Sequence, residues 1–195
     1  MKSLNTRLLM AASLVLAAFL GITGIILDRA FRTSAESALQ DRLQGNIYAL
    51  LSAAELDASG QLRLPDGLPE ARFSTPGSGL YAEVRGADGT QVWRSSSALG
   101  LQIPFISKLP AGERRLETLT IADGIVLSAL SFGVAWETNQ GNARDYIFSV
   151  AENLDGMHTQ VQSFRRSLWG WLIGVALVLL AVQGSILRWS LAPLR

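Results

Sequence analysis

Two uncharged hydrophobic runs dominate the pattern of the chain, residues 8–27 and 168–187, each 20 residues long. A helix rises about 1.5 Å per residue, so each run would measure about 30 Å, the thickness of the hydrocarbon layer of a bilayer. The pattern therefore predicts two transmembrane helices. They separate a tail of residues 1–7, a segment of residues 28–167 and a tail of residues 188–195. Two crossings put both tails on one side of the membrane and the middle segment on the other.

The first run has an alternative interpretation as a cleaved signal peptide. Lys2 and Arg7 form a basic start, and residues 35–37 are a weak candidate cleavage site. Signal peptides have apolar regions of about 7 to 15 residues, and the candidate site lies well beyond the end of this longer run. The length favours an anchor that stays in place.

The orientation of the two spans rests on their basic flanks. The tails and the ends of the middle segment carry equal numbers of basic residues, so counting them decides nothing: Lys2, Arg7, Arg188 and Arg195 against Arg29, Arg32, Arg165 and Arg166. Long loops cross the membrane largely regardless of charge. We therefore predict cytoplasmic termini, with the segment of residues 28–167 on the outer side of the membrane. Trp169, Trp171 and Trp189 at the ends of the second run are predicted membrane-interface anchors.

The pattern that follows the first run predicts a long helix over residues 28–56. This stretch has no proline, and apolar residues recur every three or four positions, as on one face of a helix: Leu39, Leu43, Ile47, Leu50 and Ala54. The helix is expected to run out of the membrane and dock on the middle domain. The stripe fits the core of that domain, and a dimer seam is the alternative.

Alternating and apolar segments predict about five antiparallel strands. A hairpin is expected over residues 80–94, with further strands at 114–121, 125–136 and 145–152 and a short one near 61–64. Residues 125–136 are apolar on both alternating faces, which predicts a central strand with helices on one face and loops on the other. Loops are expected at 95–112, with one helical turn, and at 137–144. Helix resumes around residues 153–156 and continues into the second span.

Charge and composition exclude several functions. The net charge is +1, and residues 28–167 hold all 16 Asp and Glu beside 13 of the 17 Lys and Arg, so the middle domain is not the basic domain of a nucleic-acid binder. Cysteine is absent, His158 is the one histidine, and no nucleophile, zinc or phosphate-loop motif occurs. The sequence predicts no catalytic residue and no metal site.

Two sets of residues are candidates for sensing and transmission. Tyr81, Trp93 and Trp136 could line a small-molecule pocket. Glu137 and Asp145 flank a polar loop and could bind a divalent cation. Each set also has a simpler interpretation, because aromatic residues on strands are usually core and polar loops are usually solvated. Gln183 is the one amide inside the second run and could face a helix partner or extend to the interface.

The layout resembles the sensor half of PhoQ-type two-component histidine kinases. The resemblance is carried by the hairpin at residues 80–94 with its Asp88-Gly89 turn and Trp93, by the exit at residues 165–171, and by the close at residues 189–194 with Pro193. It implies an α+β membrane protein in which two transmembrane helices flank a PAS-like (PDC) antiparallel sheet with a long N-terminal helix. It also implies that a HAMP-type linker begins at residue 188.

The resemblance further implies a homodimer that passes a stimulus through the second span, with Gln183 and Pro193 as transmitting residues. A kinase half, which would use ATP and Mg²⁺ and act on a cytoplasmic response regulator, is expected outside these residues, and no cofactor is expected within them. PhoQ-type sensors carry an acidic patch, whereas the loop at residues 137–144 is nearly uncharged. The stimulus therefore stays open between a small molecule, an ion and a peptide.

Two other classes of function fit the same layout. A stand-alone membrane-anchored periplasmic binding or assembly protein could use the same domain as an interaction module. The input domain of a chemoreceptor or of a cyclic-nucleotide enzyme could also precede a HAMP linker.

Overall fold

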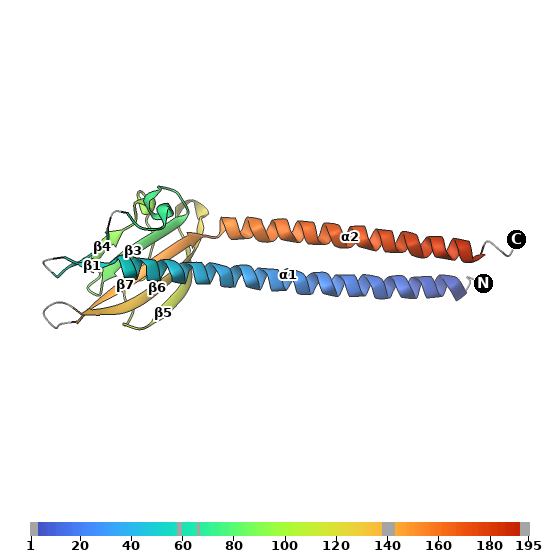
Figure 1. Cartoon of the computed structure of the whole chain (residues 1–195), viewed down its shortest axis with the longest axis horizontal. Helices are drawn as coiled ribbons and strands as arrows, with labels where there is room; N and C mark the ends of the chain where they lie inside the picture. Colours follow the sequence, from blue (N-terminus) through green and yellow to red (C-terminus); the bar gives the residue numbers. More distant parts are fainter. Residues whose placement is uncertain (1–3, 58–59, 66, 138–142, 192–195) are drawn as a thin grey trace. The chain divides into compact units, whose positions relative to one another are not determined.

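A computed structural model describes residues 4–57, 60–65, 67–137 and 143–191. It divides into two compact units (Figure 1): residues 1–36 with 158–195, which form a helix pair, and residues 37–157, which form a sheet domain. One helix, α1 (Leu4–Ala53), opens the chain, and a second, α2 (Asp155–Leu191), closes the described part. The predicted order of helix, sheet and helix is confirmed.

Both long helices contain a stretch that is long and apolar enough to cross a membrane, within Met10–Ala53 and Asp155–Ile186. The predicted continuity of the first run with the docking helix is confirmed, because α1 has no break. The helix ends at Ala53, three residues earlier than predicted. The chain there turns into β1 (Glu55–Leu56), which pairs antiparallel with the predicted short strand, β2 (Leu62–Arg63).

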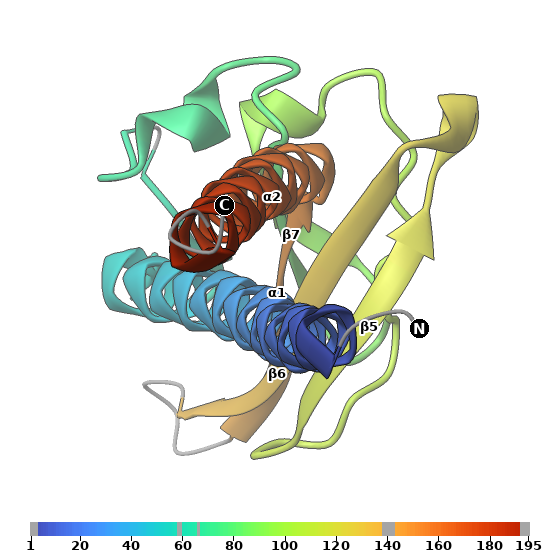
Figure 2. The ribbon, with the colours of Figure 1, turned by 90° about the vertical axis from the view of Figure 1, so that its right-hand side faces the viewer.

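The sheet domain is built on five antiparallel strands in the order β4-β3-β7-β6-β5. These are β3 (Leu80–Gly86), β4 (Gln91–Arg94), β5 (Arg114–Thr120), β6 (Val126–Glu137) and β7 (Ala143–Asn153). β3 and β4 form the predicted hairpin. Figure 2 shows β5 and β6 running side by side as a second hairpin.

One face of the sheet packs against the C-terminal half of α1. The predicted stripe of α1 lies in this core together with strand residues of alternate positions, among them Ala82, Val84, Leu130, Phe148 and Val150. Leu43 and Leu50 are fully buried, and burying one such side chain contributes about 1.5 to 3 kcal/mol. The stripe is therefore core, as its simpler interpretation held.

Loops cover the opposite face, as predicted for the strand at residues 125–136. A second core forms there between sheet residues such as Tyr81, Leu127 and Ala151 and loop residues such as Ile103 and Phe105. Short 3-10 helices punctuate the connections: η1 (Ala71–Ser74), η2 (Ser96–Ala98) and η3 (Ala122–Gly124). η2 is the helical turn expected in the loop of residues 95–112.

Two details of the strand prediction need correction. The middle of the sheet is β7, and β6 lies next to it with β5 on its outer side. The loop predicted at residues 137–144 is shorter, because Glu137 ends β6 and Ala143 already pairs with it at the start of β7. Residues 138–142 of that loop lie outside the described residues.

Candidate functional sites of the two units

The helix pair is joined along one seam, whose contacts run in antiparallel order. From the N-terminal end of α1, Ser13 meets Gln183, Gly24 meets Trp169 and Leu172, Asp28 meets Arg165, and Phe31 meets Phe164. The residue numbers of the contacts rise along α1 and fall along α2, so the two helices are antiparallel. We call these nine residues the helix seam.

Gly24 is the buried point of the seam. A Cβ atom placed on it would lie 2.8 Å from Leu172 Cδ1 and 3.2 Å from Trp169 Cη2. The missing side chain therefore lets the two helices approach, as small residues do in membrane helix pairs. Trp169, predicted as an interface anchor, lies with its ring against α1.

A bidentate ion pair lies just beyond the apolar run of each helix. Arg165 donates from Nε to Asp28 Oδ1 at 2.9 Å and from its Nη2 to Oδ2 at 2.7 Å. Both oxygens face a planar guanidinium, a geometry that fixes direction as well as distance. One turn away, the rings of Phe31 and Phe164 stack with centroids 3.9 Å apart. Sequence patterns gave no sign of either contact, because the partners lie far apart along the chain.

The predicted transmitting residues and anchors lie as follows. The Ser13 hydroxyl donates to Gln183 Oε1 at 3.4 Å, so the amide faces the partner helix of its own chain. Trp171 is 76% exposed on the surface of the helix pair. Trp189 lies within α2, but its side chain is outside the described ones, and Pro193 lies outside the described residues.

The five predicted ligand-sensing residues do not meet in one place of the sheet domain. Tyr81 is buried on the loop-covered face. Trp93 and Trp136 pack on the other face, against the α1 core, where Trp136 stacks on Phe148 at 6.3 Å. Glu137 and Asp145 are exposed. The structure thus distributes these residues over both faces and one end of the sheet.

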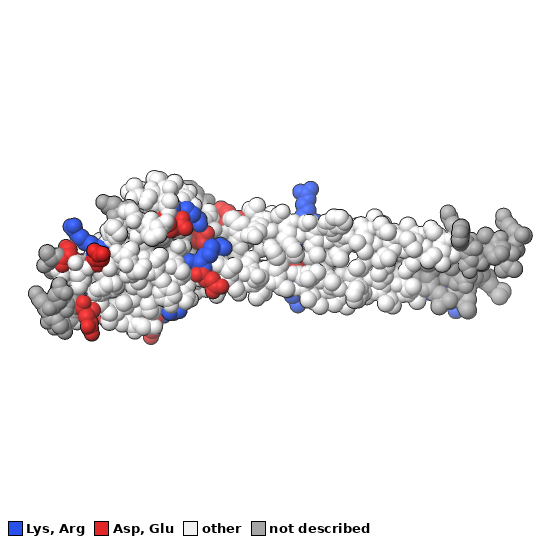
Figure 3. Space-filling model, in the orientation of Figure 1, with Lys and Arg blue, Asp and Glu red and all other residues white. Residues whose placement is uncertain are grey.

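No group of three or more His, Asp or Glu side chains that could hold a metal ion occurs among the described residues. Figure 3 shows that, on the visible face, acidic and basic side chains are interspersed over the sheet domain, while the helix pair is nearly uncharged.

A buried charge cluster that the sequence did not indicate lies on the loop-covered face. Glu83 of β3 is 1% exposed and forms ion pairs with Arg85 and with Arg94, whose Nε lies 3.7 Å from Oε2. Arg94 also donates to the Leu101 carbonyl oxygen at 2.7 Å. Glu83 occupies a polar position in the alternation of β3. The loop that covers this face changes its surroundings.

A second charge cluster ties α1 to the sheet. The Glu152 carboxylate of β7 forms two ion pairs. Its Oε1 lies 3.0 Å from Arg72 Nη1, and its Oε2 lies 3.5 Å from Nε of Arg42 in α1. Removing Glu152 would leave both guanidinium groups, which are about half exposed, without this acceptor. The cluster holds three separate segments in register.

The fold and these sites define a class of protein: a sheet domain between two helices that are each long and apolar enough to cross a membrane. Over 194 residues, the whole of the chain, it is 26% identical to the two-component sensor PhoQ of Pseudomonas aeruginosa. The predicted resemblance to PhoQ-type sensors is thereby confirmed. The chain spans 43% of the length of that relative. No protein-family model matches the chain, and no solved structure does.

Proposed function

We propose that this chain is the input module of a two-component sensor histidine kinase in the bacterial inner membrane. The similarity to PhoQ along the whole chain carries the proposal. The apolar stretches of α1 and α2 would cross the membrane, residues 28–167 would form a PAS-like periplasmic sensor domain, and two copies would form a homodimer. The helix–sheet–helix order supports this layout, because both ends of the domain continue into long helices.

The kinase half and its requirements belong to the same proposal. A HAMP linker starting near residue 188 would lead to a kinase that uses ATP and Mg²⁺ and phosphorylates a cytoplasmic response regulator. A stimulus at the sheet domain would bias α2, and a rigid helix with two arrangements can pass such a bias to a distant site. Gln183 and Pro193 would take part on the cytoplasmic side. The helix seam supports this route, since it sets the position of α2 against α1.

Fusions to alkaline phosphatase test the topology. The enzyme is active only in the periplasm, so a fusion after Gly89 should be active and a fusion after Arg195 inactive. The reverse pattern would overturn the proposed orientation. Activity of both fusions would show that the chain does not cross the membrane a second time.

A chimera tests the signalling role. Residues 1–195 are joined to the cytoplasmic half of the Pseudomonas aeruginosa PhoQ, and phosphorylation of its response regulator is measured in cells that lack the native sensor. Arg165→Ala should change the phosphorylation level, because it removes the ion pair to Asp28. Arg166→Ala is the matched control, since the neighbouring arginine forms no ion pair within the described residues. Equal output from both variants and the parent, or no phosphorylation at all, would refute the proposal.

A further inference from the structure

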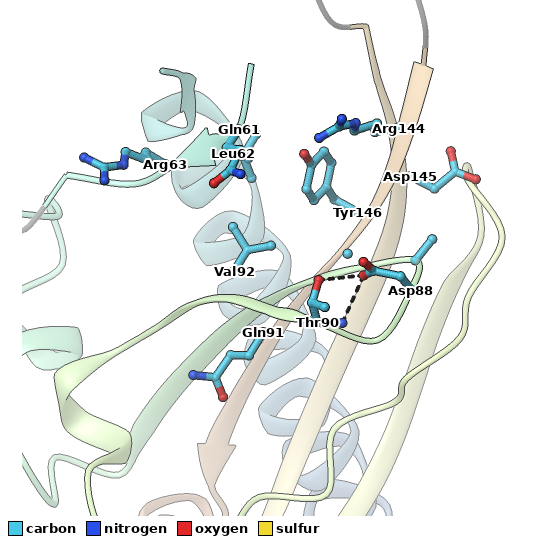
Figure 4. Close-up of a pocket in the computed structure, with 12 residues that line it drawn as sticks. Gln61, Leu62, Arg63, Asp88, Thr90, Gln91, Val92, Arg144, Asp145 and Tyr146 are labelled. Carbon is cyan, nitrogen blue, oxygen red and sulfur yellow. Dashed lines mark hydrogen bonds between the residues drawn. The ribbon is translucent and has the colours of Figure 1, made fainter. Parts of the chain in front are cut away.

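A cleft of about 780 Å³ opens at the end of the sheet where the β3–β4 turn meets the start of β7. Its walls come from three separate segments: β2, the turn and β4, and β7 (Figure 4). Pockets for small molecules measure about 300 to 1,000 Å³ and combine apolar walls with a few polar groups. This cleft is in that range. Neither the similarity to PhoQ nor the proposed function assigns anything to it.

Two side chains of β7 bring polar groups to the cleft. Arg144 and Tyr146 project from the same face of β7 toward Gln61 and Leu62, while Asp145 projects from the opposite face (Figure 4). Tyr146 is only 5% exposed as a whole residue, and its ring and hydroxyl lie at the side of the cleft (Figure 4). Arg144 is exposed and forms no ion pair or hydrogen bond with any described side chain. Its guanidinium therefore has donors that an anionic ligand could use.

The other residues of the cleft indicate which kind of ligand it could bind. Leu62 of β2 and Val92 of β4 supply the apolar walls. The carboxylate of Asp88 is already occupied, because it accepts from the Thr90 hydroxyl at 2.6 Å and from the Thr90 backbone N–H at 3.0 Å. These hydrogen bonds, that from the Thr90 side chain foremost, lower the pKa of Asp88 below its usual value. Arg63, another lining residue, is paired with Asp57 at 3.5 Å. Asp145 projects from the opposite face of β7. Among the described lining residues, the charge that faces the cleft without an ion-pair partner is therefore the cation of Arg144.

We infer that this cleft binds a small organic carboxylate with an apolar body. The carboxylate would accept from the Arg144 guanidinium and from the Tyr146 hydroxyl, and the body would lie against Leu62 and Val92. A guanidinium offers the forked donors that a carboxylate matches, and such charge-assisted hydrogen bonds are the strong ones. The binding does not depend on the proposed function. Only its consequence does: the ligand would act as a stimulus of the input module.

The test uses the full chain in detergent micelles, with phenylacetate as the probe and phenylacetamide as its neutral analogue of the same shape. Isothermal titration calorimetry should give a dissociation constant at least about tenfold lower for the acid, the advantage expected of a charge-assisted bond. Arg144→Met should remove this advantage. Tyr146→Phe, which keeps the ring, should weaken binding of the acid about threefold to tenfold by the loss of one hydrogen bond.

Arg115→Met is the matched control, because Arg115 is an exposed arginine of β5 outside the cleft. It should bind phenylacetate as the parent does. Equal affinity for acid and amide, no binding at millimolar concentration, or equal losses in the Arg144 and Arg115 variants would each overturn the inference. Such a failure would leave the chimera and fusion results of the proposed function untouched, and their failure would leave the calorimetry untouched.

Discussion

Gly133 of β6 offers the sharpest test of how the loop-covered face is built. A Cβ atom on Gly133 would lie 2.2 Å from the Pro110 carbonyl oxygen and 2.9 Å from that of Leu109. Both are backbone atoms, so no side chain can rotate away. Favourable contacts lie near 3.5 Å, so Gly133→Ala would push the loop back by about 1 Å.

The cost can be worked from the bonds that this shift disturbs. The loop is held by hydrogen bonds from the Gly112 N–H to the Gly133 carbonyl at 2.8 Å and from the Gly133 N–H to the Glu113 carbonyl at 3.0 Å. Each contributes about 0.5 to 1.5 kcal/mol, and overpacking adds about 1 to 3 kcal/mol. We expect Gly133→Ala to lower the free energy of unfolding of the sheet domain by about 2 to 6 kcal/mol.

Thermal unfolding followed by tryptophan fluorescence measures this change, because Trp93 and Trp136 lie in the sheet domain. A chain of this size loses about 2 to 4 °C of Tm per kcal/mol, so the expected shift is about 4 to 24 °C downward. Gly45→Ala is the matched control: Gly45 lies exposed in α1 with open space around its Cβ position, and alanine there should stabilise by about 0.5 to 1 kcal/mol. A Gly133 variant with the Tm of the parent would refute the close approach of the loop.

Three further predictions concern the core, the seam and the turn. Leu43→Ala should cost about 2 to 5 kcal/mol of unfolding free energy in a urea titration, since Leu43 is fully buried. The chain has no native cysteine, so Ser13→Cys with Gln183→Cys should form one intramolecular disulfide under mild oxidation, visible on a non-reducing gel, while either single variant should not. The carboxyl carbon of Asp88 should titrate below 3.8 by NMR, and Thr90→Val should raise that midpoint; the stability contributed by Asp88 is thus present above its unfolded pKa and lost as the pH falls through the lower folded pKa.

Local patterns were sufficient to predict most of the fold. The apolar stripe of α1, the Asp88-Gly89 turn and the alternation of β3 each reflect forces that act between near neighbours or toward one face. The predicted helix order, the hairpin and the short strand β2 followed from them. The end of α1 was missed by three residues, because pairing with β2 competes with the helix at Glu55.

The sites were less predictable, because their partners are distant in sequence. Glu83 looks like a solvent-facing residue until a loop covers it, and Arg165 looks like a flanking charge until Asp28 is placed opposite. Hydrophobic periodicity carries no information about which polar side chains meet. The cleft beside Arg144 and Tyr146 is likewise visible only once β2, β4 and β7 are in place.

The helix seam restricts how α2 could move against α1 if it transmits a signal. Arg165, Trp169 and Leu172 are spaced by four and three residues and so share one helix face. A rotation of α2 about its own axis would therefore move all of them away from α1 together, breaking the ion pair and uncovering Gly24. The geometry favours a pair that moves as one body, with its changes taken up elsewhere.

The disulfide between Ser13→Cys and Gln183→Cys separates the two kinds of motion. In membranes that carry the chimera, kinase autophosphorylation is measured before and after oxidation, so the reduced form of the same variant serves as its own control. If the helices move as one body, closing the disulfide should leave the rate unchanged. A large change on oxidation alone would show that α2 moves against α1, and the seam would then be the contact that opens during signalling rather than a fixed support.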